Sequence, residues 1–366
     1  MGEEIRIEIE SKNKGYPIFI GNSTSALIQK FIEENHKNKK VGIITDDNIK
    51  SLYENTISKS LNHLSPYLIS IPAGEKNKTR ETKERIEDML LEKKYSRDTI
   101  IIAFGGGVIG DLTGFVASTY NRGISIIHVP TTLLAMVDSS IGGKTGVDTK
   151  YGKNLIGTIH QPDAVFIDLN FLNSLPKEEF LNGMSEIIKI AITSDKELFE
   201  FIEKNSKEIL EKEENTLLYI IKRSIELKKE IIERDEEESG LRQTLNFGHT
   251  FGHAFENYSE YKIKHGFCIS RGIAVESKIS VLTENLKREE EKRIVSLLDK
   301  FSLPNKINED INPNKIIDIM KVDKKTRNQK PRFVILKEIG RIKTKNKDFS
   351  FEIKEDIIKK AIETPK

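Results

Sequence analysis

The chain is poor in the features that mark secreted and membrane proteins. It has one cysteine, Cys268, so no disulfide can form within the chain and we expect a reducing compartment. No stretch approaches the roughly 20 uncharged apolar residues that span a bilayer. The first residues lack the apolar core of a signal peptide. We therefore expect a soluble, cytoplasmic protein without a membrane partner.

Excess charge is also small. The net charge is +2, whereas a nucleic-acid-binding protein usually presents a strongly basic face. We therefore expect no nucleic-acid partner. Tryptophan is absent, and the 366 residues are enough for two domains with separate cores.

Short runs of isoleucine and valine are frequent in the first half. They cover residues 41–45, 99–104, 125–129 and 165–169, and polar or glycine-bearing loops follow them. This pattern predicts buried, largely parallel strands in an α/β layer. Residues 6–10 alternate between apolar and charged, which predicts one further, half-exposed strand.

The pattern changes near residue 175. Helical periodicity runs from Glu178 to Lys300 with few glycines or prolines, so we expect a mostly α-helical second domain. The sequence thus predicts two domains, 1–174 and 175–366. Residues 333–336 fit either a short strand or a buried helical turn.

A glycine-rich turn follows the strand predicted at 99–104. Gly105, Gly107 and Gly110 satisfy the GxGxxG pattern, in which glycines let a dinucleotide pyrophosphate approach a helix N-terminus. The turn lies late in the chain and lacks the usual acidic residue about 20 positions on, so a tight turn without a ligand remains an alternative. Polar loops after two other strands, with Asp46–Asn48 in one and Thr131 in the other, favour a dinucleotide-sized site at one sheet edge.

Residues 138–157 read DSSIGGKTGVDTKYGKNLIG. The segment combines glycines with Lys144, Lys150 and Lys153, a composition that suits binding of a phosphate or carboxylate. It lacks the glycine spacing of a P-loop. A flexible basic surface loop is the alternative.

Two helical stretches of the second half carry polar side chains on apolar faces. Glu186 and Lys189 are i,i+3 neighbours in an apolar run, so they share a face. Lys228 lies in line with a stripe of apolar side chains, and burying its charge is costly unless it is paired. A lysine that reaches out to solvent at the rim is the alternative.

Histidines mark a third stretch, LNFGHTFGHAFE at residues 245–256. His249 and His253 are one helical turn apart, and His265 follows in the next element. Glu186, His249 and His265 would make a site with open positions, typical of catalytic zinc. His249 and His253 with a carboxylate are the rival ligand set, and a structural role for each histidine is a third possibility.

Four motifs, in this order, resemble the 3-dehydroquinate synthase family of the shikimate pathway: DSSIGGKTGVDTKYGKNLIG, NGMSEIIK, DEEESGLRQTLNFGHTFGHAFE and VDKK. The likeness extends from Glu75 to Gly340. It implies a Rossmann-like N-terminal NAD domain, a helical C-terminal metal domain, an active site in the cleft between them, and a homodimer.

The resemblance also implies a reaction. The substrate would be 3-deoxy-D-arabino-heptulosonate 7-phosphate, and the products 3-dehydroquinate and phosphate, on the route to chorismate and the aromatic amino acids. The steps would be transient oxidation by NAD, elimination of phosphate, re-reduction and intramolecular aldol closure. NAD would be regenerated in each turnover.

Single residues take roles from the same resemblance. The implied ligands of a zinc or cobalt ion are Glu186, His249 and His265. The implied substrate and catalytic positions are Asp138, Lys144, Lys153, Asn154, Lys189, Lys228, Glu238, Arg242, Asn246, His253 and Lys324, with Arg122 reaching the neighbouring subunit's site. The implied NAD positions are Asp46, Asn48, Glu75, Lys78, Gly106, Gly107, Val108, Asp111, Thr131, Thr132 and Ser174, together with Lys144 and Lys153.

Two positions depart from the family pattern. Phe267 follows His265-Gly266 where the family usually has glutamate, so we expect altered support around the metal rather than loss of the metal. Ser174 stands where threonine is common near the NAD ribose, and it keeps the hydroxyl. The competing hypotheses are a cyclase for a neutral sugar phosphate, a dehydrogenase that releases NADH, and a binding-only relative.

Overall fold

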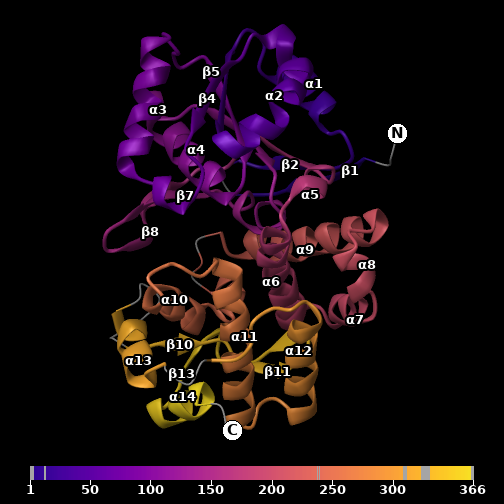
Figure 1. The fold of residues 1–366 in the computed structure, drawn as a ribbon, viewed down its shortest axis with the longest axis vertical. Helices are drawn as coiled ribbons and strands as arrows, with labels where there is room; N and C mark the ends of the chain where they lie inside the picture. The colour runs from indigo at the N-terminus through magenta and orange to yellow at the C-terminus, as the bar shows by residue number, and fades with distance from the viewer. Residues whose placement is uncertain are drawn as a thin grey trace. The chain divides into compact units, whose positions relative to one another are not determined.

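The structure is a computed structural model that describes residues 4–11, 14–236, 238, 240–307, 311–322 and 330–363. The chain divides into two compact units, residues 1–179 and 180–366 (Figure 1). The division falls inside helix α6 (Lys177–Ser194), whereas the sequence led us to expect it just before this helix. Among the described residues, no helix combines the length and apolar character that crossing a bilayer requires.

A seven-stranded sheet organises the first unit. Its strands lie in the order β1–β2–β9–β6–β5–β3–β4. All neighbours are parallel except the antiparallel pair β1–β2. The bounds are β1 Ile5–Ile9, β2 Tyr16–Gly21, β3 Lys40–Asp46, β4 Tyr67–Ile71, β5 Thr99–Gly105, β6 Ser125–Pro130 and β9 Ala164–Asp168.

The strand order creates a switch point between β3 and β5. The chain runs from β3 outward to β4, then crosses back past β3 to β5 and continues to β6 and β9. In sheets of this kind, ligands bind at the carboxyl ends of the strands that flank the switch point. Asp46 ends β3 and Gly105 ends β5, so the predicted dinucleotide loops lie at this place.

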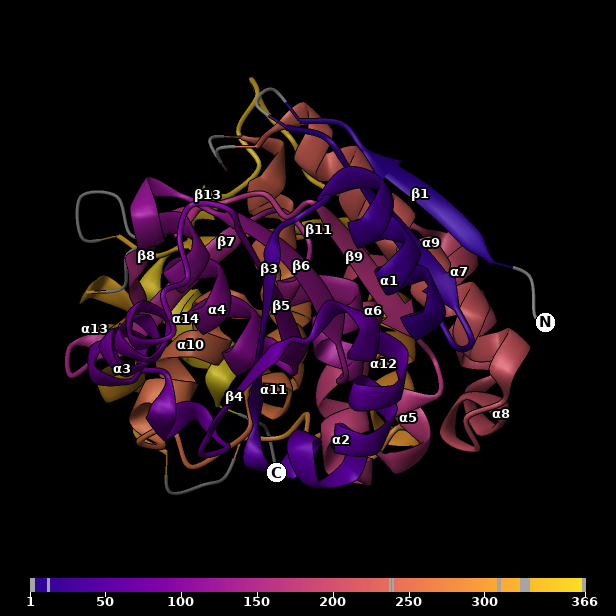
Figure 2. The same cartoon turned by 90° about the horizontal axis from the view of Figure 1, so that it is seen from above.

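Helices cover both faces of the sheet. Figure 2 shows α1 (Ser25–Asn35) and α2 (Asp47–Leu61) on one side, and α3 (Arg80–Glu92) and α4 (Gly107–Thr119) on the other. Isoleucines of the central strands are fully buried against α3 and α4, as Ile101 illustrates. Burial on both faces explains why these strands read as continuous apolar runs rather than as alternating patterns.

The segment after β6 contains two unusual elements. Residues Ala135–Ser139 form a π-helical turn, a geometry that is often found at functional sites. β7 (Lys144–Thr149) and β8 (Gly152–Ile159) then form a separate antiparallel hairpin. The lysine- and glycine-rich segment is therefore an ordered hairpin rather than an irregular loop.

The second unit is mostly helical, as predicted. Its helices are α6 from Phe180 on, α7 Lys196–Lys204, α8 Ser206–Leu210, α9 Glu214–Arg234, α10 His249–Tyr258, α11 His265–Leu282, α12 Arg288–Lys300, α13 Pro313–Val322 and α14 Glu355–Ile362. A core of buried side chains lies between α10, α11, α13 and α14. Two small antiparallel pairs complete it, β10 (Arg332–Phe333) with β13 (Phe351–Glu352), and β11 (Leu336–Glu338) with β12 (Arg341–Ile342). Residues 333–336 thus form neither one strand nor a helical turn, because Phe333 ends β10, Leu336 begins β11 and the two residues between them belong to no strand.

Five strands of the seven-stranded sheet are confirmed as predicted, namely β1, β3, β5, β6 and β9, and its other two strands, β2 and β4, were not predicted. β2 begins with Tyr16-Pro17, and a proline normally argues against an interior strand. β4 is a five-residue edge strand. Neither was recognised as one of the isoleucine- and valine-rich runs that identified β3, β5, β6 and β9.

An ion-pair cluster ties three loops of the first unit together. Asp163, just before β9, accepts a hydrogen bond from Lys14, and its other carboxylate oxygen lies 3.0 Å from His36 Nε2 at the end of α1. The Asp163 side chain is 8% exposed. Burial alone would raise the pKa of Asp163, but the hydrogen bonds from His36 and Lys14 lower it to about 2.

This lowered pKa predicts a pH-dependent contribution to stability. A carboxyl group with a lowered folded-state pKa stabilises the fold above its unfolded pKa of 3.8, and the contribution is lost as pH falls toward 2. We expect Asp163→Asn to lower the free energy of unfolding by about 2 kcal/mol at pH 7, measured by urea denaturation. The difference from wild type should shrink between pH 4 and pH 3. Exposed Asp98→Asn is the control, and an equal loss at both ends of the range would contradict a charge effect.

Candidate active site

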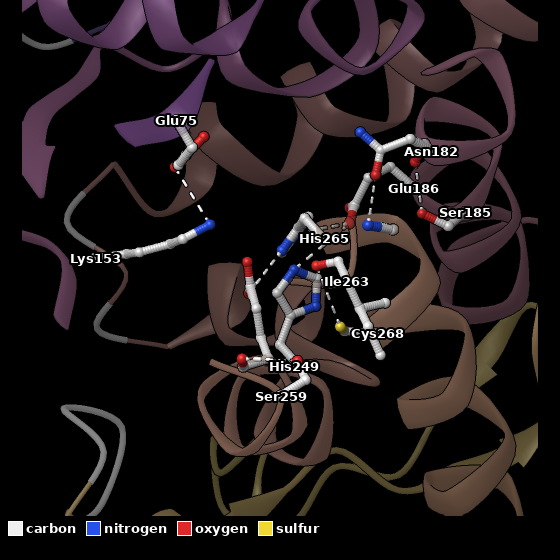
Figure 3. A network of polar contacts seen from close by, with 12 residues as sticks. Glu75, Lys153, Asn182, Ser185, Glu186, His249, Ser259, Ile263, His265 and Cys268 are labelled. Atoms are coloured by element: carbon white, nitrogen blue, oxygen red, sulfur yellow. Dashed lines mark hydrogen bonds and ion pairs between the residues drawn. The ribbon is translucent and has the colours of Figure 1, made fainter. Parts of the chain in front are cut away.

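Three helices of the second unit bring a carboxylate and two imidazoles together (Figure 3). Glu186 lies on α6, His249 is the first residue of α10, and His265 is the first residue of α11. Glu186 Oε1 lies 3.6 Å from His249 Nε2 and 3.5 Å from His265 Nε2. Glu186 is 3% exposed. The three side chains therefore point at one place inside the unit.

The approach of α6 to α11 explains why Glu186 and His265 meet. Asn182 Oδ1 accepts a hydrogen bond of 2.6 Å from the backbone N–H of Gly266, in the first turn of α11. A Cβ atom on Gly266 would lie 2.2 Å from the Asn182 carbonyl oxygen, so only glycine fits. Glu186 lies one turn after Asn182 on α6, which places its carboxylate beside His265.

A second glycine contact brings α10 against α11. Gly248, which precedes His249, has φ +77°, a conformation that favours glycine. A Cβ atom on Gly272 of α11 would lie 1.8 Å from the Gly248 carbonyl oxygen. The start of α10, and His249 with it, is therefore fixed against the helix that carries His265.

Hydrogen bonds at the second ring nitrogen orient both histidines. His249 Nδ1 lies 3.1 Å from the Phe247 carbonyl oxygen, and His265 Nδ1 lies 3.3 Å from Glu256 Oε2. A proton on each Nδ1 leaves Nε2 as the ligand atom on the side of Glu186, which is the usual arrangement around bound metals. Asn182 and Glu256 were not among the predicted site residues, because their role depends on packing.

His265 carries a strongly perturbed pKa. Burial alone would lower the pKa of His265, but hydrogen bonds to Glu186 and Glu256 raise it to about 9. A metal binds the neutral imidazole, so binding at this site would release a proton.

His253 lies close to the same place. The ring centre of His253 lies 5.1 Å from the ring centre of His249 and 5.7 Å from that of His265. One ligand atom from each of the three histidines can be chosen so that all lie within 4.8 Å of one another. The structure thus places Glu186 beside His249 and His265 and also groups the three histidines, so distance alone does not choose between the two ligand sets, and imidazole and carboxylate ligands of either kind suit zinc.

Two further predicted residues of the second unit are lysines on α6 and α9. Lys189 forms an ion pair with Glu186, one turn earlier on α6. Lys228 is only 5% exposed on α9, so it is buried and not a lysine that reaches out to solvent. Burial requires compensation for its charge. Lys324 lies outside the described residues.

The loop before α10 holds the remaining predicted side chains. Asp235 accepts hydrogen bonds from the backbone N–H groups of Gly240 and Arg242, at 2.7 and 2.8 Å. The Arg242 side chain is buried and donates to the Glu236 carbonyl oxygen. Asn246 donates to Glu238 Oε1 at 2.7 Å.

In the first unit, the glycine turn fits an anionic group. Gly106 precedes α4 and Gly107 starts it. A Cβ atom on Gly106 would lie 3.0 Å from Thr132, and one on Gly107 would lie 3.1 Å from the Ser139 hydroxyl. Thr131 Oγ1 and Ser139 Oγ are buried and have no hydrogen-bond partner among the described residues. A helix N-terminus with two unused hydroxyls nearby suits a pyrophosphate.

The carboxyl end of β3 places two further predicted residues. Asp46 Oδ1 accepts hydrogen bonds from the backbone N–H groups of Asn48 and Ile49, at 3.0 and 3.1 Å, so it caps the start of α2. Burial raises the pKa of Asp46. Ser174 shares a hydrogen bond with Tyr53 of α2. Val108 continues the α4 turn beside Gly107.

A buried lysine organises the rest of the predicted cofactor residues. Lys78 Nζ is 2.5 Å from Asp111 Oδ2 and 2.6 Å from Asn154 Oδ1. Burial alone would lower the pKa of Lys78, but Asp111 and Glu75 raise it, so the lysine is charged. Lys153 Nζ lies 3.3 Å from Glu75 Oε1 (Figure 3).

The last three predicted residues of the first unit lie on turns or at the start of a strand. Asp138 lies on the π-helical turn, and Lys144 is exposed at the start of β7. Arg122 is exposed and has φ +67° at the end of a 3-10 turn.

Comparisons with known proteins agree over nearly the whole chain. The family model described as 3-dehydroquinate synthase N-terminal matches residues 68–182, and the one described as 3-dehydroquinate synthase C-terminal matches residues 183–326. The 3-dehydroquinate synthase of Thermodesulfovibrio yellowstonii is 42% identical over 363 residues, covering 98% of this chain and 99% of that protein. The same enzyme of Thermoanaerobacter pseudethanolicus is 43% identical over 343 residues, covering 92% and 95%.

Solved structures share the fold. A 2-epi-5-epi-valiolone synthase from Streptomyces hygroscopicus, with NAD+ and Zn2+ bound, matches with a TM-score of 0.86 and 25% identity over 96% of this chain and 97% of that chain. A 2-deoxy-scyllo-inosose synthase has a TM-score of 0.86 at 24% identity over 98% and 99%, which shows the fold alone. Both family models and the full-length identity to curated relatives show that the chain belongs to the 3-dehydroquinate synthase family.

Proposed function

We propose that this chain converts 3-deoxy-D-arabino-heptulosonate 7-phosphate into 3-dehydroquinate and phosphate. The observation that carries the proposal is that the Nε2 atoms of His249 and His265 both lie within 3.6 Å of Glu186 Oε1. This meeting occurs in a chain 42% identical to a named 3-dehydroquinate synthase over its full length. The protein is then a carbon–oxygen lyase that uses NAD and one divalent ion.

The proposed NAD site is the switch-point edge of the first unit. Its support is the α4 N-terminus with the unused hydroxyls of Thr131 and Ser139, together with the NAD+ named for the solved valiolone synthase. The assigned residues are Asp46, Asn48, Glu75, Lys78, Gly106, Gly107, Val108, Asp111, Thr131, Thr132, Lys144, Lys153 and Ser174.

The proposed metal ligands are Glu186, His249 and His265. When bound there, a zinc or cobalt ion would supply Lewis acidity that lowers the pKa of a substrate alcohol. Glu256 would hold His265 through Nδ1, and the Phe247 carbonyl oxygen would hold His249. His253, one turn from His249, would then act on the substrate and move a proton during phosphate elimination.

The proposed substrate positions are chosen to match a doubly anionic ligand. Phosphate and carboxylate groups require several converging cations and N–H donors, which orient them and stabilise the charge of the leaving phosphate. The assigned residues are Arg122, Asp138, Lys144, Lys153, Asn154, Lys189, Lys228, Glu238, Arg242, Asn246, His253 and Lys324.

A phosphate-release assay tests the reaction. With substrate, NAD and zinc, we expect the purified protein to release phosphate and 3-dehydroquinate, and a chelator to abolish the release. Absorbance at the NADH band should not accumulate, because the hydride returns to the substrate. Neutral heptulose phosphate and glucose 6-phosphate serve as comparison substrates. Faster turnover of a neutral sugar would favour another cyclase, and net NADH with a simple polyol would favour a dehydrogenase.

Substitution of single histidines separates the two ligand sets. We expect His249→Ala to lose most of the metal, because an imidazole ligand is removed, and His253→Ala to keep it while turnover falls about 10²- to 10⁴-fold. Bound zinc is measured by elemental analysis after dialysis, and affinity by competition with a chromogenic chelator. Equal metal loss in both variants would favour the paired-histidine set.

We also propose a homodimer in which Arg122 reaches the neighbouring subunit's site. Hairpin β7–β8 exposes Tyr151 by 79%, Leu155 by 48% and Ile159 by 53%, and exposed apolar side chains of this kind often mark an interface.

Mixed dimers test the Arg122 assignment. Arg122→Ala and His249→Ala should each be inactive alone. Co-refolding them should restore about a quarter of wild-type activity, because half the dimers would contain one intact site. No restoration would place Arg122 in the site of its own subunit.

A further inference from the structure

A register shift in the β7–β8 hairpin of the first unit sets one acidic residue of β7 against three residues of β8. The register of β7 against β8 shifts between Val147 and Thr149, so Asp148 lies at the irregular position. Bulges are common next to active sites, where they redirect a side chain. The sequence pattern gave Asp148 no role, because a bulge depends on the pairing of two strands.

Asp148 contacts the backbone of a strained residue. Asn154 has φ +53°, in the left-handed region that side chains other than glycine rarely adopt. Its backbone N–H donates to Asp148 Oδ1 at 3.0 Å, across the turn of the hairpin. The Asp148 N–H in turn donates to the Lys78 carbonyl oxygen at 2.8 Å. Asp148 therefore joins the hairpin to the segment that carries Lys78.

The Asn154 side chain has one defined orientation. A lysine ammonium group can only donate, so the atom 2.6 Å from Lys78 Nζ must be the Asn154 amide oxygen. Lys78 is held charged by Asp111 and Glu75. Asn154 is an exposed residue, and its amide nitrogen keeps N–H groups that suit an anion such as a phosphate.

We propose that Asp148 is a positioning residue that locks Asn154 in its left-handed conformation, so that the Asn154 amide nitrogen is presented to the phosphate group of the substrate. The inference rests on the proposed function, since Asn154 is assigned there to the substrate. Asp148 acts only through Asn154 and does not itself touch the ligand.

A hydrogen bond between carboxyl groups holds Asp148 from the other side. Burial and the charge of Glu75 raise the pKa of Asp148, whereas Lys78 and Lys153 lower it. The resulting pKa is about 6. Burial alone would raise the pKa of Glu75 too, but Lys78, Lys153 and the hydrogen bond from Asp148 lower it. Below about pH 6, protonated Asp148 can therefore donate to ionised Glu75 while Oδ1 accepts from the Asn154 N–H, and at higher pH the acceptor role toward Asn154 remains.

Asparagine keeps the oxygen that accepts from the Asn154 N–H, and its amide can donate to Glu75 as the protonated acid does, whereas alanine does neither. We expect Asp148→Ala to lower kcat/KM roughly 10- to 100-fold and to weaken binding of inorganic phosphate by a similar factor. Asp148→Asn should stay within about threefold of wild type. Phosphate binding is measured by isothermal titration calorimetry, which does not require turnover. Asp163→Ala, which removes a buried carboxylate elsewhere in the unit, should leave both quantities unchanged.

A double substitution tests whether Asp148 acts through Asn154. Asn154→Gly accepts the left-handed backbone but removes the amide, so adding Asp148→Ala to it should cost no further phosphate affinity. An additive loss, an Asp148→Asn variant as weak as Asp148→Ala, or an Asp148→Ala protein that binds phosphate like wild type would each overturn the inference. A wild-type protein that binds phosphate but releases none from the substrate would instead overturn the proposed function.

Discussion

The second unit depends on three helices that approach more closely than side chains normally permit. Gly266 lets the start of α11 rest on the backbone of α6, and Gly272 lets α11 rest on the turn before α10. Both contacts lie within one or two turns of His265 and His249. The two imidazoles are therefore fixed by backbone packing, which varies less than the rotamer of a long side chain. Preorganisation of this kind places ligand atoms before any ligand arrives.

The first unit builds its polar site around buried charge instead. Lys78 is 3% exposed, and an isolated buried ammonium group would cost several kcal/mol. Asp111 and the Asn154 amide oxygen offset this cost, so the lysine becomes a rigid centre that orders three segments. The β7–β8 hairpin is attached to this centre by two hydrogen bonds, from the Asp148 N–H to the Lys78 carbonyl oxygen and from Lys78 Nζ to the Asn154 amide oxygen. The strain at Asn154, about 1–3 kcal/mol for a residue of this kind, is sustained by those contacts.

Much of this organisation is readable in the sequence, and the reason lies in local pattern. Isoleucine runs identified β3, β5, β6 and β9 because burial on both faces leaves a continuous apolar signal. The short edge strand β4, and β2 with Pro17, leave no such signal. Motif resemblance supplied Glu186, His249 and His265 as one set, and the structure brings them together. Asn182, Glu256 and Asp148 were missed because each acts across elements that only the fold makes adjacent. The spacing of the histidines in the sequence did not show whether His253 is a metal ligand. The distances in the structure do not show it either, because all three histidines lie close together.

The carboxylates around the histidines also compensate the positive charge of two helix N-termini. α10 and α11 both begin at a predicted ligand, and each helix N-terminus carries roughly half a positive charge. Two such ends beside a divalent cation would repel it. Glu186 and Glu256, 3% exposed each, place negative charge directly beside the imidazoles at these helix starts. Their desolvation costs several kcal/mol per group, and the ion pairs with Lys189 and His265 offset part of this cost. The same positive helix ends remain favourable for an anionic substrate. At the imidazole nitrogens, therefore, the buried carboxylates rather than the helix starts set the local charge.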